Sequence, residues 1–281
     1  MKIAILTGIP IRYGGKGSYI LNELSYLVEQ DHEIILIYWS DPKSNVPERR
    51  PREEIFKKIR IMRFEPVHGW MLRGPIYLLF NVILFSFFIR SLSKTIKINV
   101  IHAHDPTVAL GALFAGMGKK TILHVHSPYQ KDKFIIDAPL ADLGLKIRVR
   151  ALLNHPFDVL LVLLVYNLVR HVLCVSEFEY DDVKNKAILS KKIWITRCGV
   201  ETSFFGPDLN KSSVKPLILQ GKFVVLYVGR MVNKNGPMLI AEAAKKMEKL
   251  GDKETFFVFA GDGPEKQSIE ELIKKNSLRN I

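Results

Sequence analysis

Short apolar runs alternate with longer amphipathic stretches along most of the chain. Runs rich in β-branched and aliphatic residues, bounded by turn residues, predict strands at 3–7, 33–39, 59–64, 99–102, 121–125, 171–175 and 193–196. Helical periodicity fills most of the intervals, at 16–30, 77–94, 107–116, 140–170 and 177–187. Strands that alternate with helices predict an α/β fold, with a parallel sheet covered on both faces.

A turn-rich stretch at about residues 206–219 interrupts this pattern. The alternation then resumes with strands at 223–228 and 255–260 and helices at 236–250 and 265–275. We therefore predict an amino-terminal domain over 1–205, a linker over 206–221 and a carboxy-terminal domain over 222–281. This last domain is incomplete, because a doubly wound domain normally needs about 100 residues or more.

The composition is that of an ordinary globular protein, with 48% hydrophobic and 25% charged residues among 281. Its two cysteines, Cys174 and Cys198, are far apart and form no CxxC pair, which argues against a disulfide framework or a cysteine zinc site. The amino terminus leads directly into a predicted strand without an apolar signal region. We therefore expect a cytoplasmic protein.

The net charge of +13 favours anionic partners. The run 76–89, IYLLFNVILFSFFI, is shorter than the ~20 residues that span a membrane. A basic segment beside an apolar helix is typical of a peripheral membrane protein, here at the inner face of the cell membrane, although a buried core helix explains the run as well. No nucleic-acid-binding motif accompanies the charge, so we expect no nucleic-acid partner. The basic residues before the run are Arg49, Arg50, Arg52, Lys57, Lys58, Arg60, Arg63 and Arg73.

The loop after the first predicted strand contains Gly14 and Gly15 and leads into a helix. Glycines let a ligand approach the backbone, and a helix amino terminus can hold an anion. The loop matches neither the dinucleotide fingerprint nor a Walker loop, and a tight structural turn explains it equally well.

Two pairs of histidines lie at carboxyl ends of predicted strands, where open α/β sheets bind their ligands. His102 and His104 form one pair and His124 and His126 the other, and residues two apart in a strand share a face. With Asp105 they could hold a metal. Alternatively, one histidine of each pair packs internally and the other contacts substrate. We favour this alternative, because nothing in the sequence indicates further ligands.

Two more strand-to-helix turns lie in the carboxy-terminal part. One contains Gly229, Arg230 and Lys234, and the other contains Gly261 and Gly263. Cations placed just after a strand suit a diphosphate, so the two turns together indicate a phosphate-rich ligand.

In their order and spacing, these motifs resemble those of glycosyltransferase family 4. The resemblance implies a GT-B fold with two Rossmann-like doubly wound domains, the second truncated here. It rests on Gly14-Gly15, the His104 and His126 strand ends, Val175-Ser176-Glu177, Gly199-Val200-Glu201 with Phe205 and Pro207, Gly229-Arg230, and Gly261-Asp262-Gly263-Pro264.

Such enzymes hold the acceptor mainly in the first domain and the nucleotide sugar mainly in the second. They transfer the sugar with retention and without a metal or other cofactor. The resemblance implies catalytic roles for His126 near the transferring sugar and for Arg230 and Lys234 at the departing diphosphate. It implies substrate-binding roles for Gly14, Gly15, His104, Ser176, Gly229, Gly261 and Gly263.

The sequence departs from the family pattern at three places. Asn235 stands where relatives carry the lysine before the glycine of its turn, and Lys234 lies one position earlier. Arg197-Cys198 replaces the usual Pro-Asn. The family's two-glutamate motif is missing, so we expect little or no transferase activity from this polypeptide alone.

Three functions therefore stand as hypotheses. The first is retaining transfer from a nucleotide-diphosphate sugar to a lipid-linked or polysaccharide acceptor, at an anionic membrane surface. The second is a non-catalytic remnant, or a subunit of a split transferase that needs a missing carboxy-terminal polypeptide. The third is a metal-dependent hydrolase that uses the paired histidines.

Overall fold

The computed structural model describes residues 1–8, 14–39, 53–56, 58–67, 74–127, 145–187, 192–200, 202 and 221–281. These residues belong to two compact units, one within 1–201 and the other mainly from 202 onward. Apart from Gly221, the predicted linker lies outside the described residues, so the proposed domain boundaries stay a prediction.

The first unit is built on an eight-stranded sheet in the order β3-β4-β2-β1-β5-β6-β7-β8. Each neighbouring pair is parallel except β3 and β4. The strands are β1 (Lys2–Thr7), β2 (Glu33–Trp39), β3 (Glu53–Phe56), β4 (Ile59–Phe64), β5 (Val100–Ala103), β6 (Thr121–Val125), β7 (His171–Cys174) and β8 (Lys192–Ile195).

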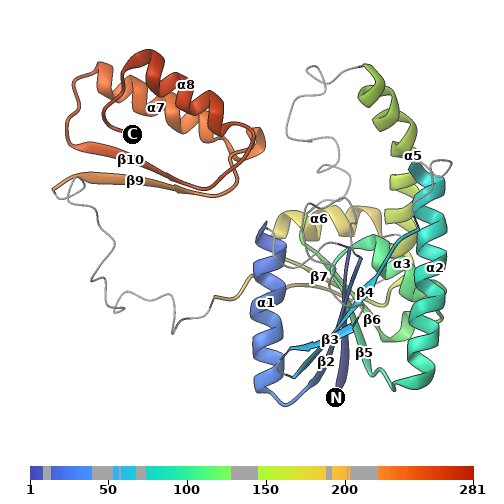
Figure 1. Cartoon of the computed structure of the whole chain (residues 1–281). Helices are drawn as coiled ribbons and strands as arrows, with labels where there is room; N and C mark the ends of the chain where they lie inside the picture. The colour runs from blue at the N-terminus through green and yellow to red at the C-terminus, as the bar shows by residue number, and fades with distance from the viewer. Residues whose placement is uncertain are drawn as a thin grey trace. The chain divides into compact units, whose positions relative to one another are not determined.

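Helices cover both faces of this sheet, as its buried strands require. Helix α1 packs on one face and α2, α3 and α5 on the other (Figure 1). Alternate residues of β1 serve the two faces: Ile3 and Ile5 pack with α1, whereas Ala4 and Leu6 join the opposite core. The helices are α1 (Gly14–Glu29), α2 (Gly74–Thr95), α3 (Pro106–Phe114), η1 (Gly118–Lys120), α5 (Leu145–Leu168) and α6 (Glu177–Lys186).

The elements predicted for the first unit are confirmed, and β3 was missed. This strand has only four residues and is the antiparallel edge of the sheet. Its Ile55 and Phe56 are exposed, and Glu53 pairs with Arg60 of β4 at 2.6 Å. Such a short, charged edge strand lacks the apolar run that marks the others.

Helix α2 contains the apolar run of the sequence and belongs to the globular fold. Val82, Phe85 and Ile89 are fully buried in the core on its side of the sheet. By length and composition Pro75–Thr95 could also cross a membrane, with 33% of its most apolar window buried. The opposite side of the helix is apolar but exposed, through Ile76, Leu79, Phe80, Ile83 and Phe87.

The described members of the basic segment are paired with acids. Lys58 lies 3.0 Å from Asp31, and Arg63 lies 2.8 Å from Glu54. Arg60 has its own partner, Glu53, so these three cations offer less attraction to an anionic surface than the sequence indicates. Arg49, Arg50, Arg52, Lys57 and Arg73 lie outside the described residues.

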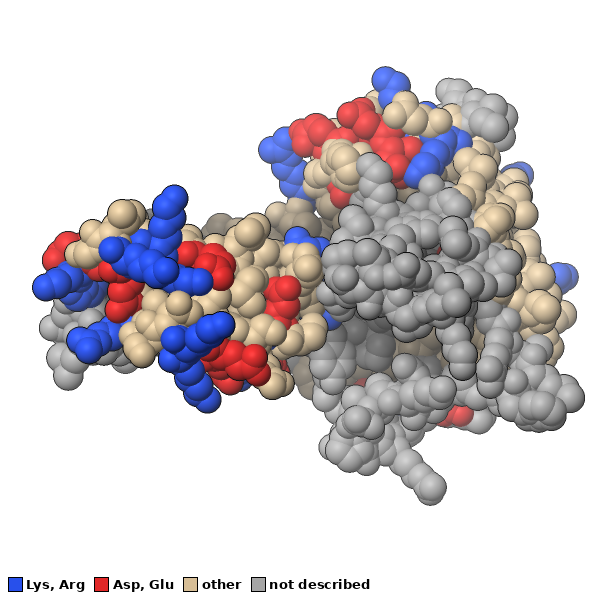
Figure 2. All heavy atoms as spheres, turned by 90° about the horizontal axis from the view of Figure 1, so that it is seen from above, with Lys and Arg blue, Asp and Glu red and all other residues tan. Residues whose placement is uncertain are grey.

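The second unit contains two parallel strands, β9 (Phe223–Val228) and β10 (Thr255–Ala260), as predicted. A short turn η4 (Asn233–Asn235) precedes α7 (Pro237–Lys249), and α8 (Lys266–Asn276) follows β10. Met231, Ala241 and Ile269 form its small buried core. Lys and Arg are interspersed with Asp and Glu on its surface (Figure 2).

Candidate active site

The four histidines lie together on the α1 face of the first unit's sheet. His102 pairs in register with Ile5 on one side and Ile122 on the other, and His124 lies two residues beyond Ile122. His104 and His126 follow at the carboxyl ends of β5 and β6, so the period of two places all four rings on one face. The two histidines of each pair share a face, as the strand period predicts, and the two pairs lie on the same face.

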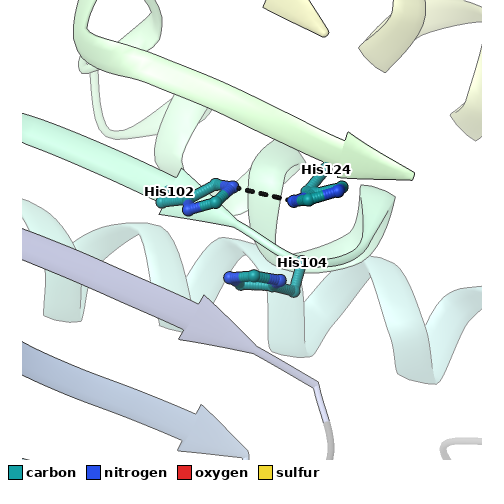
Figure 3. A group of neighbouring side chains, drawn as sticks. All are labelled: His102, His104 and His124. Carbon is teal, nitrogen blue, oxygen red and sulfur yellow. Dashed lines mark hydrogen bonds between the residues drawn. The ribbon is translucent and has the colours of Figure 1, made fainter. Parts of the chain in front are cut away.

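The rings form two hydrogen-bonded pairs across neighbouring strands. His102 Nε2 lies 3.2 Å from His124 Nδ1, and His104 Nδ1 lies 2.9 Å from His126 Nε2. His102 points directly toward His124, and His104 lies beside them (Figure 3). The rings stack within 16° and 23° of parallel in the two pairs.

Helix α1 places a carboxylate and a phenol on this cluster. Glu23 Oε1 lies 2.5 Å from His102 Nδ1, and Glu23 Oε2 lies 3.3 Å from His104 Nε2. The ring of Tyr19 packs edge-on against His124 and His126, at centroid distances of 4.8 and 5.0 Å. Neither Glu23 nor Tyr19 belongs to a motif recognised in the sequence.

Burial sets the charge of the cluster. It lowers the pKa of His104 to about 4, of His124 to about 2 and of His126 to about 3. Burial alone would raise the pKa of Glu23, but hydrogen bonds and charge from His102 and His104 outweigh it and hold that pKa far below its usual value. At neutral pH, His104, His124 and His126 are therefore neutral beside an ionised Glu23.

Asp105 has a structural role beside the cluster. Its side chain accepts the backbone N–H of Gly8 at 2.6 Å and that of Val108 at 3.2 Å, which caps α3. Lys16 of α1 pairs with it at 3.2 Å. Burial would raise its pKa, but the charge of Lys16 and these hydrogen bonds lower it.

A pocket of about 330 Å³ opens at the carboxyl ends of β1, β5 and β6. Its polar wall combines neutral imidazoles with the Lys16–Asp105 pair, and its apolar wall includes a residue of α2, Leu78. Such a mixture suits a ligand with hydroxyl groups and an apolar part. The lining residues are Gly8, Lys16, Trp39, Leu78, His104, Asp105, Pro106, Thr107, His124, Val125, His126 and Ser127.

The metal hypothesis fits this geometry poorly. Ligand nitrogens of His102, His104 and His124 lie within 4.8 Å of one another, whereas nitrogens bound tetrahedrally to zinc are about 3.4 Å apart. Asp105 is outside this group, because its carboxylate is engaged by the α3 cap and Lys16. A proton shared between His102 Nε2 and His124 Nδ1 also occupies the space where a metal would bind.

The remaining predicted residues of the first unit are in different surroundings. Gly14 begins α1, and no described atom lies within 4 Å of a Cβ built on Gly15, so packing among the described residues does not require a glycine there. The hydroxyl of Ser176 caps α6 by accepting the N–H of Phe178 at 3.2 Å, and it also donates to Glu179. The spacing Ser176-x-x-Glu179 matches the capping-box pattern in the sequence, and in the structure Glu179 contacts the Ser176 hydroxyl.

In the second unit, the two predicted turns pack against each other at the ends of β9 and β10. Met231 N–H donates to Asp262 O at 2.8 Å, and Glu265 N–H donates to Met231 O at 3.0 Å. Arg230 and Lys234 lie on the exposed loop after β9. The amide of Asn235 donates to the carbonyl of Arg230 at 2.9 Å, so this departure from the family pattern helps to close the turn.

Comparison with known proteins places this arrangement in a family. Residues 13–204 match Glycosyltransferase Family 4, and residues 209–280 match Glycosyl transferases group 1. The chain belongs to glycosyltransferase family 4 and has the GT-B type of α/β fold.

One curated relative matches over a short segment. The chain is 38% identical over 63 residues to 2-deoxystreptamine N-acetyl-D-glucosaminyltransferase from Niallia circulans. The match covers 22% of this chain and 16% of that protein. The chain therefore matches much less than two thirds of the relative's length.

Solved structures match nearly the whole chain at low identity and support the fold. Sucrose-phosphate synthase from Thermosynechococcus elongatus matches at a TM-score of 0.71 and 15% identity, over 99% of this chain and 68% of that one. HepE from Anabaena, solved with UDP and glucose, matches at a TM-score of 0.60 and 13% identity, over 100% of this chain and 67% of that one. A glycosyltransferase from Rickettsia africae matches at a TM-score of 0.58 and 16% identity, over 99% of this chain and 66% of that one.

Proposed function

We propose that this chain binds a nucleotide-diphosphate sugar and serves its transfer to an acceptor with retention of configuration. The observation that supports this most is the pair His104–His126, which lines a pocket at the carboxyl ends of the sheet. Neutral imidazoles there can exchange hydrogen bonds with sugar hydroxyls, and family membership supplies the reaction class.

The donor's diphosphate is assigned to the loop of Arg230 and Lys234. Breaking the bond between sugar and diphosphate builds negative charge on the departing oxygens, and cations stabilise that charge. We assign to Gly14 and Gly15, at the amino terminus of α1, a backbone approach to a phosphate, since a Cβ built on Gly15 would meet no described atom within 4 Å. These assignments rest on the family pattern and on the exposure of the loop.

The acceptor is proposed to be lipid-linked, at an anionic membrane surface. Leu78 of α2 lines the pocket, and the exposed side of the same helix is apolar. Helix α5, which contacts α2, adds Leu160, Leu164 and Leu168, which are 54%, 40% and 54% exposed. Four basic residues nearby are exposed: Arg90 and Lys94 lie in α2, Lys119 lies in η1, and Arg170 follows α5. We refer to the exposed apolar residues of α2 and α5 as the apolar face.

Isothermal titration of the 281-residue chain with UDP-, GDP- and ADP-sugars tests the donor assignment. Micromolar binding of one nucleotide class is expected. If a folded chain binds none of them, the donor site proposed here is wrong, and the remnant or split-transferase hypothesis becomes the better one. Metal analysis of the purified protein addresses the hydrolase hypothesis, which predicts a stoichiometric bound metal.

A further inference from the structure

One carboxylate contacts both histidine pairs. Glu23 lies at hydrogen-bonding distance from His102 through one oxygen and within ion-pair distance of His104 through the other. An ionised carboxylate can only accept hydrogen bonds. His102 Nδ1 therefore carries the proton of this hydrogen bond, and a proton on His104 Nε2 keeps its lone pair from facing the carboxylate oxygen at 3.3 Å.

These two protons determine the positions of the others. A neutral imidazole has one N–H and one lone pair, so His104 with a proton on Nε2 has a lone pair on Nδ1. His126 Nε2 lies 2.9 Å from that lone pair and must supply the proton of this hydrogen bond. In the other pair, His102 Nε2 and His124 Nδ1 share one hydrogen bond at 3.2 Å.

We infer that Glu23 is a positioning residue that fixes the tautomer of His126 through His104, with a proton on Nε2 and a lone pair on Nδ1. This inference rests on the proposed role of His126 at the sugar. A ring nitrogen with a lone pair accepts hydrogen bonds and cannot donate them. His126 Nδ1 is therefore suited to a sugar hydroxyl, which donates, and unsuited to a phosphate oxygen.

The substitution Glu23→Gln provides a sharp test. A glutamine amide has one acceptor and one donor, so one of the two histidines must now accept a hydrogen bond where it previously donated. That ring must carry its proton on the other nitrogen, and its partner must change with it. One pair changes tautomer and the other does not.

The readout is the pattern of protonated and unprotonated ring nitrogens in ¹⁵N-histidine NMR at neutral pH. In the unsubstituted chain, His104 and His126 are expected to be protonated on Nε2. In Glu23→Gln, either His104 and His126 or His102 and His124 change together. Glu29→Gln, on the exposed side of the same helix, should leave all four unchanged.

Two results would overturn the inference. One is a proton on Nδ1 of His126 in the unsubstituted chain. This measurement does not depend on the folding of any variant. The other is an unchanged set of tautomers in folded Glu23→Gln. The NMR test uses no sugar, so its outcome is independent of the proposed function. If the tautomers are as expected but no donor binds, the donor site is wrong and the role of Glu23 stands.

Discussion

A Cβ atom built on Gly261 would lie 1.9 Å from the carbonyl oxygen of Gly229. The two glycines directly follow β10 and β9, and Gly229 N–H donates to Ala260 O at 3.0 Å. The turns of the second unit thus pack backbone against backbone. Gly263 repeats the arrangement, since its Cβ would lie 2.5 Å from Met231 O. These backbone contacts explain why glycine occupies positions 261 and 263, independently of the substrate-binding role predicted for Gly261 and Gly263.

Gly261→Ala should therefore destabilise the second unit. The backbone must move to relieve the overlap, and we expect a cost of about 2–4 kcal/mol. Hydrogen exchange of the β9 and β10 amides measures this loss locally. Gly229→Ala is the matched control, because its Cβ would meet only the side chain of Tyr227 at 3.4 Å. Equal protection in the two variants would show that the overlap is relieved at no cost.

The stability of the first unit should fall in mild acid. His104, His124 and His126 have pKa values lowered by burial, so between pH 6.5 and about 4 the unfolded chain binds protons that the folded chain does not. Stability is then fully present above this window and is lost as pH falls. Each histidine contributes up to about 1.4 kcal/mol per pH unit, or about 4 kcal/mol together between pH 7.5 and 5.5.

Tryptophan fluorescence during denaturation reports this change selectively, because all three tryptophans, Trp39, Trp70 and Trp194, belong to the first unit. The second unit contains no histidine in residues 221–281 and serves as an internal control. The protection factors of its strand amides should change little over the same interval. A first unit of equal stability at pH 7.5 and 5.5 would mean that the imidazoles are charged or solvated in the fold.

The position of the histidine cluster could be predicted from the sequence, whereas its hydrogen bonding could not. Strand period and the shared edge of parallel strands suffice to bring His104 and His126 together. Glu23 belongs to no motif recognised in the sequence. It reaches the rings because Ile20 and Leu24 are buried under α1 and set the rotation of that helix. Packing of this kind is tertiary information.

Charge was the least predictable property. The basic segment before α2 indicates an anionic partner in the sequence, but Lys58, Arg60 and Arg63 are each paired with an acid. Two of those acids belong to β3, the strand that the hydrophobic pattern missed. Helix α5 likewise buries Leu161, Val162 and Val165 in the core and exposes Leu160, Leu164 and Leu168 on its other side.

Removal of either cation from the proposed donor loop should weaken nucleotide-sugar binding. Hydrogen bonds to charged groups contribute about 1.5–3 kcal/mol, so Arg230→Ala and Lys234→Ala should each raise Kd by roughly 10- to 100-fold. Titration calorimetry with the nucleotide class that binds measures the change. Lys249→Ala removes an exposed cation at the end of α7 and should leave Kd unchanged. Equal losses in all three variants would indicate non-specific attraction.

The apolar face should bind anionic vesicles, and loss of its exposed side chains should weaken that binding without unfolding the protein. Phe87 is 64% and Leu164 40% exposed, so Phe87→Ser and Leu164→Ser remove few core contacts. Burial of a large apolar side chain contributes about 1.5–3 kcal/mol, and we expect the double variant to bind at least about tenfold more weakly in sedimentation. Leu21→Ser alters a 48% exposed leucine of α1, on the opposite face of the sheet, and this variant should bind vesicles normally.

Vesicle binding should also decrease with added salt, because salt screens the attraction between the anionic surface and Arg90, Lys94, Lys119 and Arg170. If the unsubstituted chain does not sediment with anionic vesicles at low salt, the apolar face does not contact a membrane, and a soluble acceptor becomes the better proposal.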